Sequence, residues 1–74
     1  MRLGTMKIKK TDEEHYHVRD DFMDERVNGS QLLAMLSGKD LIGTTPDAVL
    51  RLLDEHDIGY ETVVGYKTTL GETI

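Results

Sequence analysis

The chain has 74 residues, 38% of them apolar, with no cysteine, no tryptophan and a formal net charge of −5 at pH 7. This length allows one small domain with a modest core, and the missing cysteines exclude disulfides, thiolate nucleophiles and thiolate metal sites. No apolar run approaches the about 18 residues that span a bilayer, and the N-terminus lacks the apolar stretch of a signal peptide, so we expect a cytoplasmic protein.

Two short strands are predicted near the N-terminus. Apolar and polar residues alternate over residues 6–10 and again over 15–19, with the polar segment 11–14 between them. A period of two is typical of half-buried strands, and the polar segment suits a reversal of the chain, so we expect a β-hairpin. Residues 1–5 show no pattern, and we expect them to form a flexible tail.

The segment 20–27 has the least regular pattern. It holds four acids in eight residues, and we expect a loop with at most one turn of helix, which places Phe22 in the core. A helix is predicted at 30–37, with Ser30 as its N-cap. A capping box between Asn28 and Gln31 is the alternative start.

The clearest helix signal lies at residues 45–56. Thr45 can cap the first turn, Pro46 suits the first helical position, and the apolar residues that follow have helical spacing. These apolar residues are Val49, Leu50, Leu52 and Leu53.

The last predicted element is a strand from Gly59, with β-branched and aromatic residues on both sides of Gly65. Gly65 suits either a bulge in one long strand or a turn into a short extra C-terminal strand. We expect residues 71–74 to be a flexible tail. The sequence therefore predicts a single α+β domain of order β-β-α-α-β, in which two helices cover one face of a small antiparallel sheet.

Two histidines form the best candidate metal site. His15 and His17 are two residues apart on a predicted strand, so their imidazoles share one face and could bind one metal ion. A third ligand would come from a nearby carboxylate. The candidate carboxylates are Asp12, Glu14, Asp20 and Asp21.

The charged residues suggest two further surfaces. An acidic cluster follows the basic N-terminus, and we expect it to recognise a protein partner. Its members are Asp12, Glu13, Glu14, Asp20, Asp21, Asp24 and Glu25. Weak nucleic-acid binding through Lys7, Lys9 and Lys10 is an alternative, although the net negative charge opposes it.

No pattern in the chain indicates catalysis. Ser30 and Ser37 have no motif that places a base beside them, and the acids are too numerous and solvated to form a catalytic pair. We therefore expect a noncatalytic protein-binding or regulatory module without a cofactor. Homodimerisation is a further expectation, because a small sheet with an exposed edge can pair with a second copy.

Overall fold

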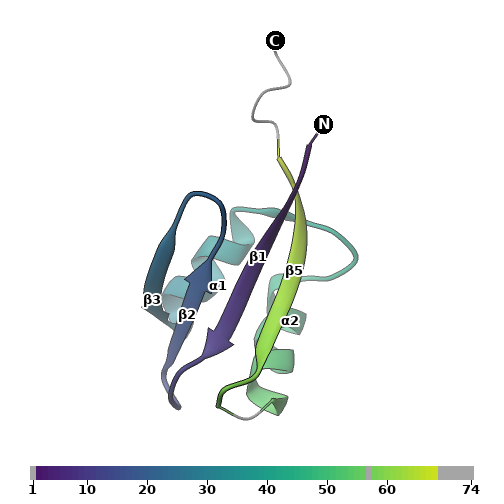
Figure 1. The fold of residues 1–74 in the computed structure, drawn as a ribbon. Helices are drawn as coiled ribbons and strands as arrows, with labels where there is room; N and C mark the ends of the chain where they lie inside the picture. Colours follow the sequence, from purple (N-terminus) through teal and green to yellow (C-terminus); the bar gives the residue numbers. More distant parts are fainter. Residues whose placement is uncertain (1, 57, 69–74) are drawn as a thin grey trace.

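The computed structural model describes residues 2–56 and 58–68, which form a five-stranded antiparallel sheet with two helices on one face (Figure 1). The elements in chain order are β1 (Arg2–Lys10), β2 (His15–Arg19), β3 (Asp24–Asn28), α1 (Gly29–Ser37), β4 (Asp40–Leu41), α2 (Pro46–Glu55) and β5 (Glu61–Thr68). The predicted α+β class is confirmed. The strands are ordered β3-β2-β1-β5-β4, so the first strand lies in the middle of the sheet. No helix in the described ranges is long and apolar enough to cross a membrane.

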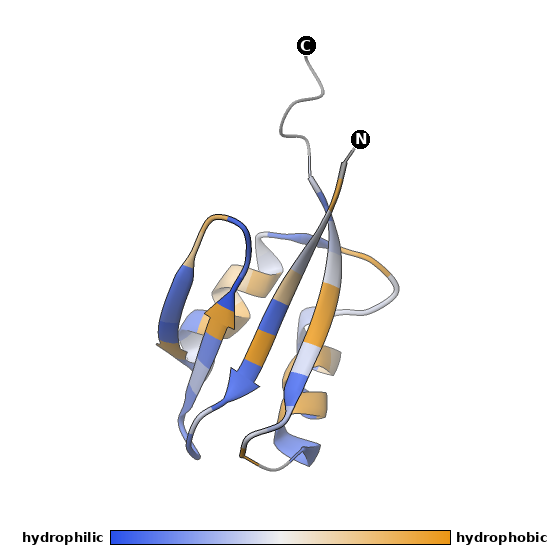
Figure 2. Ribbon diagram, in the orientation of Figure 1, coloured by the Kyte–Doolittle hydropathy of each residue, from blue (hydrophilic) through white to orange (hydrophobic). Residues whose placement is uncertain are grey.

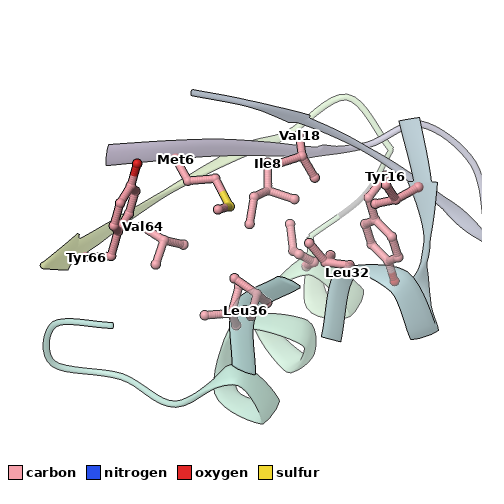
Figure 3. Packing of buried hydrophobic residues seen from close by; sticks show 11 residues of the cluster. Met6, Ile8, Tyr16, Val18, Leu32, Leu36, Val64 and Tyr66 are labelled. Atoms are coloured by element: carbon pink, nitrogen blue, oxygen red, sulfur yellow. The ribbon is translucent and has the colours of Figure 1, made fainter. Parts of the chain in front are cut away.

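The core lies between the sheet and the two helices. Apolar and polar residues alternate along β1 and β2, and the apolar side chains point toward the helices (Figure 2, Figure 3). The buried residues are Met6, Ile8, Tyr16, Val18, Val27, Leu32, Leu36, Val49, Leu53, Val64 and Tyr66. The predicted hairpin is confirmed, because β1 and β2 pair as antiparallel strands. Their period of two buries one face of the hairpin and leaves the other face uncovered.

Both helices begin at capped residues. The Asn28 side chain accepts a hydrogen bond from the Gln31 N–H at 2.8 Å, and the Gln31 side chain accepts one from the Asn28 N–H at 3.0 Å. This reciprocal pair is the predicted alternative, and Ser30 as N-cap is wrong. For α2 the predicted cap is confirmed, because the Thr45 hydroxyl accepts a hydrogen bond from the Ala48 N–H at 3.3 Å.

Removal of the capping box should destabilise the protein. We expect Asn28→Ala to lower the free energy of unfolding by about 1 kcal/mol, since the Gln31 N–H loses its acceptor. Ser30→Ala is the matched control, because Ser30 is exposed and is not the cap. Urea unfolding followed by circular dichroism measures both. Equal losses for the two variants would contradict the assignment of the cap.

The segment 20–27, predicted as a loop, contains the edge strand β3. This strand pairs with β2 from Arg19 opposite Asp24 to His15 opposite Asn28. An edge strand can hold many charges, because both of its faces and one edge reach solvent, and in β3 Val27 alone is buried. The low strand propensity of acidic residues is therefore overridden by cross-strand pairing.

Phe22 is 77% exposed, so its predicted place in the core is wrong. The carboxylate of Asp20 accepts hydrogen bonds from the Phe22 and Met23 N–H groups at 2.7 and 2.9 Å, and the Asp20 N–H donates to the Met23 carbonyl at 3.0 Å. This Asp-centred turn holds Phe22 at its tip. Met23 instead packs against the core from the β2–β3 turn.

The two ends of the chain also differ from the prediction. Residues 2–5, expected as a flexible tail, belong to β1 and pair with residues 65–68 of β5. Gly65 lies inside β5, which is one continuous strand from Glu61 to Thr68, so the predicted single strand is confirmed. The predicted bulge is wrong, because the pairing with β1 keeps one register through Gly65 opposite Thr5. The predicted tail 71–74 lies outside the described residues.

Gly4 permits the close approach of β1 and Tyr66. The two residues are opposite each other on β1 and β5, and a Cβ at Gly4 would lie 2.6 Å from Cζ of the Tyr66 ring. The Tyr66 ring is buried there. Lys39, in the connection between α1 and β4, places its Nζ 4.6 Å from the centroid of this ring, as a cation–π contact.

A methyl group at Gly4 should displace this ring. We expect Gly4→Ala to lower the free energy of unfolding by about 1–3 kcal/mol through overpacking. Gly29→Ala is the control, because its Cβ would lie 3.8 Å from the Tyr16 ring, which is ordinary contact, and its helical position favours alanine. A Gly4→Ala variant as stable as the parent protein would contradict the packing of Tyr66 against β1.

Candidate functional site

The two histidines lie on the uncovered face of β2, as the alternation predicts, because Tyr16 between them is buried. Each has its own carboxylate. Nδ1 of His15 lies 2.9 Å from Oδ1 of Asp12 in the β1–β2 turn, whereas Nε2 of His17 contacts Oδ1 of Asp24 on β3. The structure therefore places the two imidazoles on one face but gives them different partners.

These contacts do not assemble a recognisable metal centre. Over residues 2–56 and 58–68, no three side chains of histidine, aspartate or glutamate are grouped closely enough to hold a metal ion. His15 and His17 as ligands stay a prediction, and a third ligand would require side chains to move.

Asp12 organises the β1–β2 turn. Its Oδ1 accepts hydrogen bonds from the Glu14 and His15 N–H groups at 2.8 Å each, and its Oδ2 lies 2.7 Å from the Arg26 guanidinium on β3. The Glu14 N–H, the His15 ring and the Arg26 guanidinium together hold the pKa of this carboxyl well below its usual range. The turn is thereby fixed to the edge strand.

This lowered pKa predicts acid sensitivity. A carboxyl whose pKa is lower in the folded protein than in the unfolded chain contributes stability above the unfolded pKa of about 3.9, and this contribution disappears as the pH falls further. Asp12→Asn should therefore be less stable than the parent at pH 7, and the difference should narrow below about pH 4. Urea midpoints from pH 7 to pH 2.5 measure the difference, with the exposed Glu13→Gln as control. A difference that is constant with pH would contradict this role.

The predicted acidic cluster of 12–25 does not form one surface. Residues 12–14 lie in the β1–β2 turn and residues 20–21 lie in the β2–β3 turn, at the opposite end of β2 (Figure 1). On β3, Asp24 is opposite Arg19 on the uncovered face, while Glu25 is opposite buried Val18 and points the other way. A partner that recognised all these acids would have to reach both ends and both faces of the sheet.

The N-terminal lysines do not form one surface either, because Lys10 contacts a helix while Lys7 and Lys9 lie on the uncovered face of the sheet. Nζ of Lys10 lies 3.4 Å from the carboxylate of Asp54 on α2, which also accepts a hydrogen bond from the Tyr16 hydroxyl at 3.1 Å. These contacts attach α2 to the sheet. Lys7 and Lys9 lie on the uncovered face, where Lys9 is opposite Glu61 of β5.

Most cations of the uncovered face have an acid nearby. Lys7 and Arg19 are directly opposite each other on β1 and β2, which brings two like charges together. They border a shallow hollow with Thr5, and Asp20 and Asp21 line the same hollow. Positive and negative groups therefore alternate on this face, and it offers no continuous basic path for a nucleic acid.

Within residues 2–56 and 58–68, the outer edge of β5 is paired over only half of the strand. β4 pairs only with Tyr66 and Lys67, and the Ile42 N–H then donates to the Gly65 carbonyl at 3.0 Å. Gly43 follows with a φ of 75°, in the left-handed region that favours glycine, and the chain leaves the sheet there. Among the described residues, no strand lies beside residues 61–64 on this side.

Exposed apolar side chains lie on β5 and on the segments next to it. Five of the seven large apolar side chains that are exposed in the described part come from β5 and the segments next to it, the exceptions being Leu3 and Phe22. The five are Ile42, Leu52, Ile58, Tyr60 and Val63. We call the edge of residues 61–64 together with these five side chains the β5 edge site.

Leu52 belongs to this site because of its position on α2. Asp54, on the same helix, contacts Lys10 and Tyr16, so its flank of α2 faces β1 and β2. Leu52 lies two residues earlier, about 200° around the helix, and therefore occupies the flank that faces away from β1 and β2, beyond β5. It is 42% exposed, unlike Val49 and Leu53 of the same predicted apolar stripe, which are buried.

The β5 edge site was missed by reasoning from sequence. Leu41 on β4 packs against the core, whereas the next residue, Ile42, is 42% exposed. A signal was present in Gly43, which ends β4 after two residues. Comparison of the chain with protein-family models, curated proteins and solved structures finds no match.

Proposed function

We propose that this protein is a noncatalytic protein-binding module that holds its partner at the β5 edge site. One observation carries the proposal: among the described residues no strand pairs with β5 at its outer edge over residues 61–64, and exposed apolar side chains lie on β5 and on the segments next to it. Unpaired strand edges supply main-chain donors and acceptors, while apolar surface beside them supplies the burial that makes association favourable. The absence of cysteine from the chain suits a cytoplasmic module.

The two edge regions of the sheet differ in charge, and this difference supports the proposal. β3, at the opposite edge, exposes Asp24, Glu25 and Arg26 in succession, and such charges discourage pairing with another strand. Along the open part of β5, Glu61 is the one charged residue, and Val63 is 58% exposed. Strand edges that are protected against association usually carry more charged residues than residues 61–64 do.

The charge of the chain favours a different protein over a second copy. If two copies paired through residues 60–64 as antiparallel strands, the pairing would centre on Thr62. The two Glu61 carboxylates would then lie diagonally, about 7–8 Å apart. Each copy would also bring a net charge of −5. A partner with basic residues would be attracted both by Glu61 and by the net negative charge of the chain, so we propose a heterologous partner.

The other predicted surfaces receive less support from the geometry. His15 and His17 already contact separate carboxylates, and the lysines of the uncovered face alternate with acids. The acids of 12–25 are spread over both ends of β2. Metal binding and nucleic-acid binding stay predictions that no contact in the described residues favours.

Selection from a library of displayed random peptides tests the proposal. We expect the parent protein to enrich binding peptides, and we expect Val63→Lys to lose at least about tenfold in affinity for them, because a lysine blocks the edge. Phe22→Lys is the matched control. It places the same charge on another exposed apolar residue, 77% exposed against 58% for Val63, at the β2–β3 turn.

Two results would contradict the proposed function. Failure to enrich any peptide on the parent protein would argue against a binding module at this edge, and equal binding to the parent and Val63→Lys would place the site elsewhere. Sedimentation of the free protein gives a separate check. We expect a monomer, and a stable dimer dissociated by Val63→Lys would show that the edge serves a second copy instead.

A further inference from the structure

We infer that the partner joins the sheet as an antiparallel strand beside residues 61–64, and that it presents two consecutive apolar residues followed by a basic residue. This inference rests on the proposed function, because it specifies how the β5 edge site is occupied. Its two parts, main-chain pairing and the order of side chains, follow from different observations.

The direction of the main-chain groups is set by the contact with Ile42. The Gly65 carbonyl points away from β1, since it accepts the Ile42 N–H. Along a strand, the N–H and C=O groups of successive residues point to opposite edges. Val63 and Glu61, two and four residues from Gly65, therefore also direct their N–H and C=O groups to the outer edge. Thr62 and Val64 direct theirs to β1, with which they pair.

The line of β4 shows where the added strand fits. Asp40 is opposite Lys67 and Leu41 is opposite Tyr66, so continued pairing would place residue 44 opposite Val63. Gly43 turns the chain away one residue before that point. An antiparallel partner strand would continue β4 in its own direction, in the place that the chain has left.

The side chains of β5 set the pattern of the partner. Val63 and Glu61 point to the uncovered face, because Val64 is buried on the other face. In an antiparallel pair, a partner residue opposite Val63 shares that face, the next faces the helices opposite Thr62, and the third is opposite Glu61.

The surroundings then assign a chemistry to each position. The first residue meets Val63 and is apolar. The second points to the helix side of the sheet, where Leu52 is exposed on the outer flank of α2, and is apolar as well. The third meets the carboxylate of Glu61 and is lysine or arginine. A parallel strand would require the reverse order, with the basic residue first.

Methylation of the peptide backbone tests the main-chain part. The probe is the tightest peptide selected on the parent protein, with one amide N-methylated at a time. We expect the loss of affinity to alternate along the peptide. Methylation of amides that face β5 should cost about tenfold or more, and methylation of the amides between them, which face solvent, should cost little. Equal effects at all positions would overturn strand addition.

Glu61→Gln tests the side-chain order. We expect peptides selected on the parent protein to carry the triplet apolar, apolar, basic, and we expect selection on Glu61→Gln to lose the preference for the basic residue alone. Glu13→Gln is the control, since it removes the same charge from the exposed β1–β2 turn. A basic preference that survives in Glu61→Gln, or a triplet in reverse order, would overturn the proposed register and direction.

These outcomes separate the inference from the function on which it rests. Suppose that Val63→Lys abolishes binding of the selected peptides but that the position of methylation has no effect. This result would support a binding site at this edge and would rule out strand addition. An absence of selected peptides would instead remove the proposed function itself.

Discussion

The pairing of β1 along both of its edges is the interaction on which the rest of the structure depends. β1 pairs with β5 from Arg2 to Lys9 and with β2 from Lys7 to Lys10, so the two halves of the sheet are joined through it. Its buried side chains, Met6 and Ile8, lie in the core between the sheet and the helices (Figure 3). Because β1 occupies the middle, β3 and β4 become the edges, and their lengths decide which main-chain groups stay free.

The chain treats these two edges differently. β3 pairs with β2 along its full length, and Arg26 of β3 also contacts Asp12 in the β1–β2 turn. β4 pairs only with the last part of β5, and the chain then leaves the sheet at Gly43 and enters α2 after the N-cap Thr45. Five large apolar side chains of this small domain are exposed on β5 and on the segments next to it. Burial of these side chains within the domain would have added to a limited core, so their exposure is informative about function.

Local signals predicted the elements that depend on local interactions. Alternation of apolar and polar residues predicted β1 and β2, and Thr45–Pro46 followed by a leucine stripe predicted α2. Both signals work because strand faces and helix caps depend on residues that are close in sequence. The sequence could not predict β3, whose stability comes from pairing with β2 and from contacts of Asp24 and Arg26 with residues on other elements. Propensity alone disfavours that strand.

The same distinction applies to the candidate site. The common face of His15 and His17 follows from their spacing, but their separate carboxylate partners follow from the register of the hairpin. The open edge of β5 depends on strand order and on where β4 ends, which are properties of the assembled sheet. Only Gly43 carried a local sign of it, because glycine favours the positive φ at which the chain departs.

The central claim is that Val63 directs its main-chain groups to an unpaired edge while its neighbour Val64 pairs with β1. Amide hydrogen exchange of the free protein, resolved by residue with NMR, tests this most directly. The account predicts that the Val63 amide exchanges rapidly and that the Val64 amide is strongly protected. Equal protection of the two amides would show that the edge is already covered, and would contradict the account.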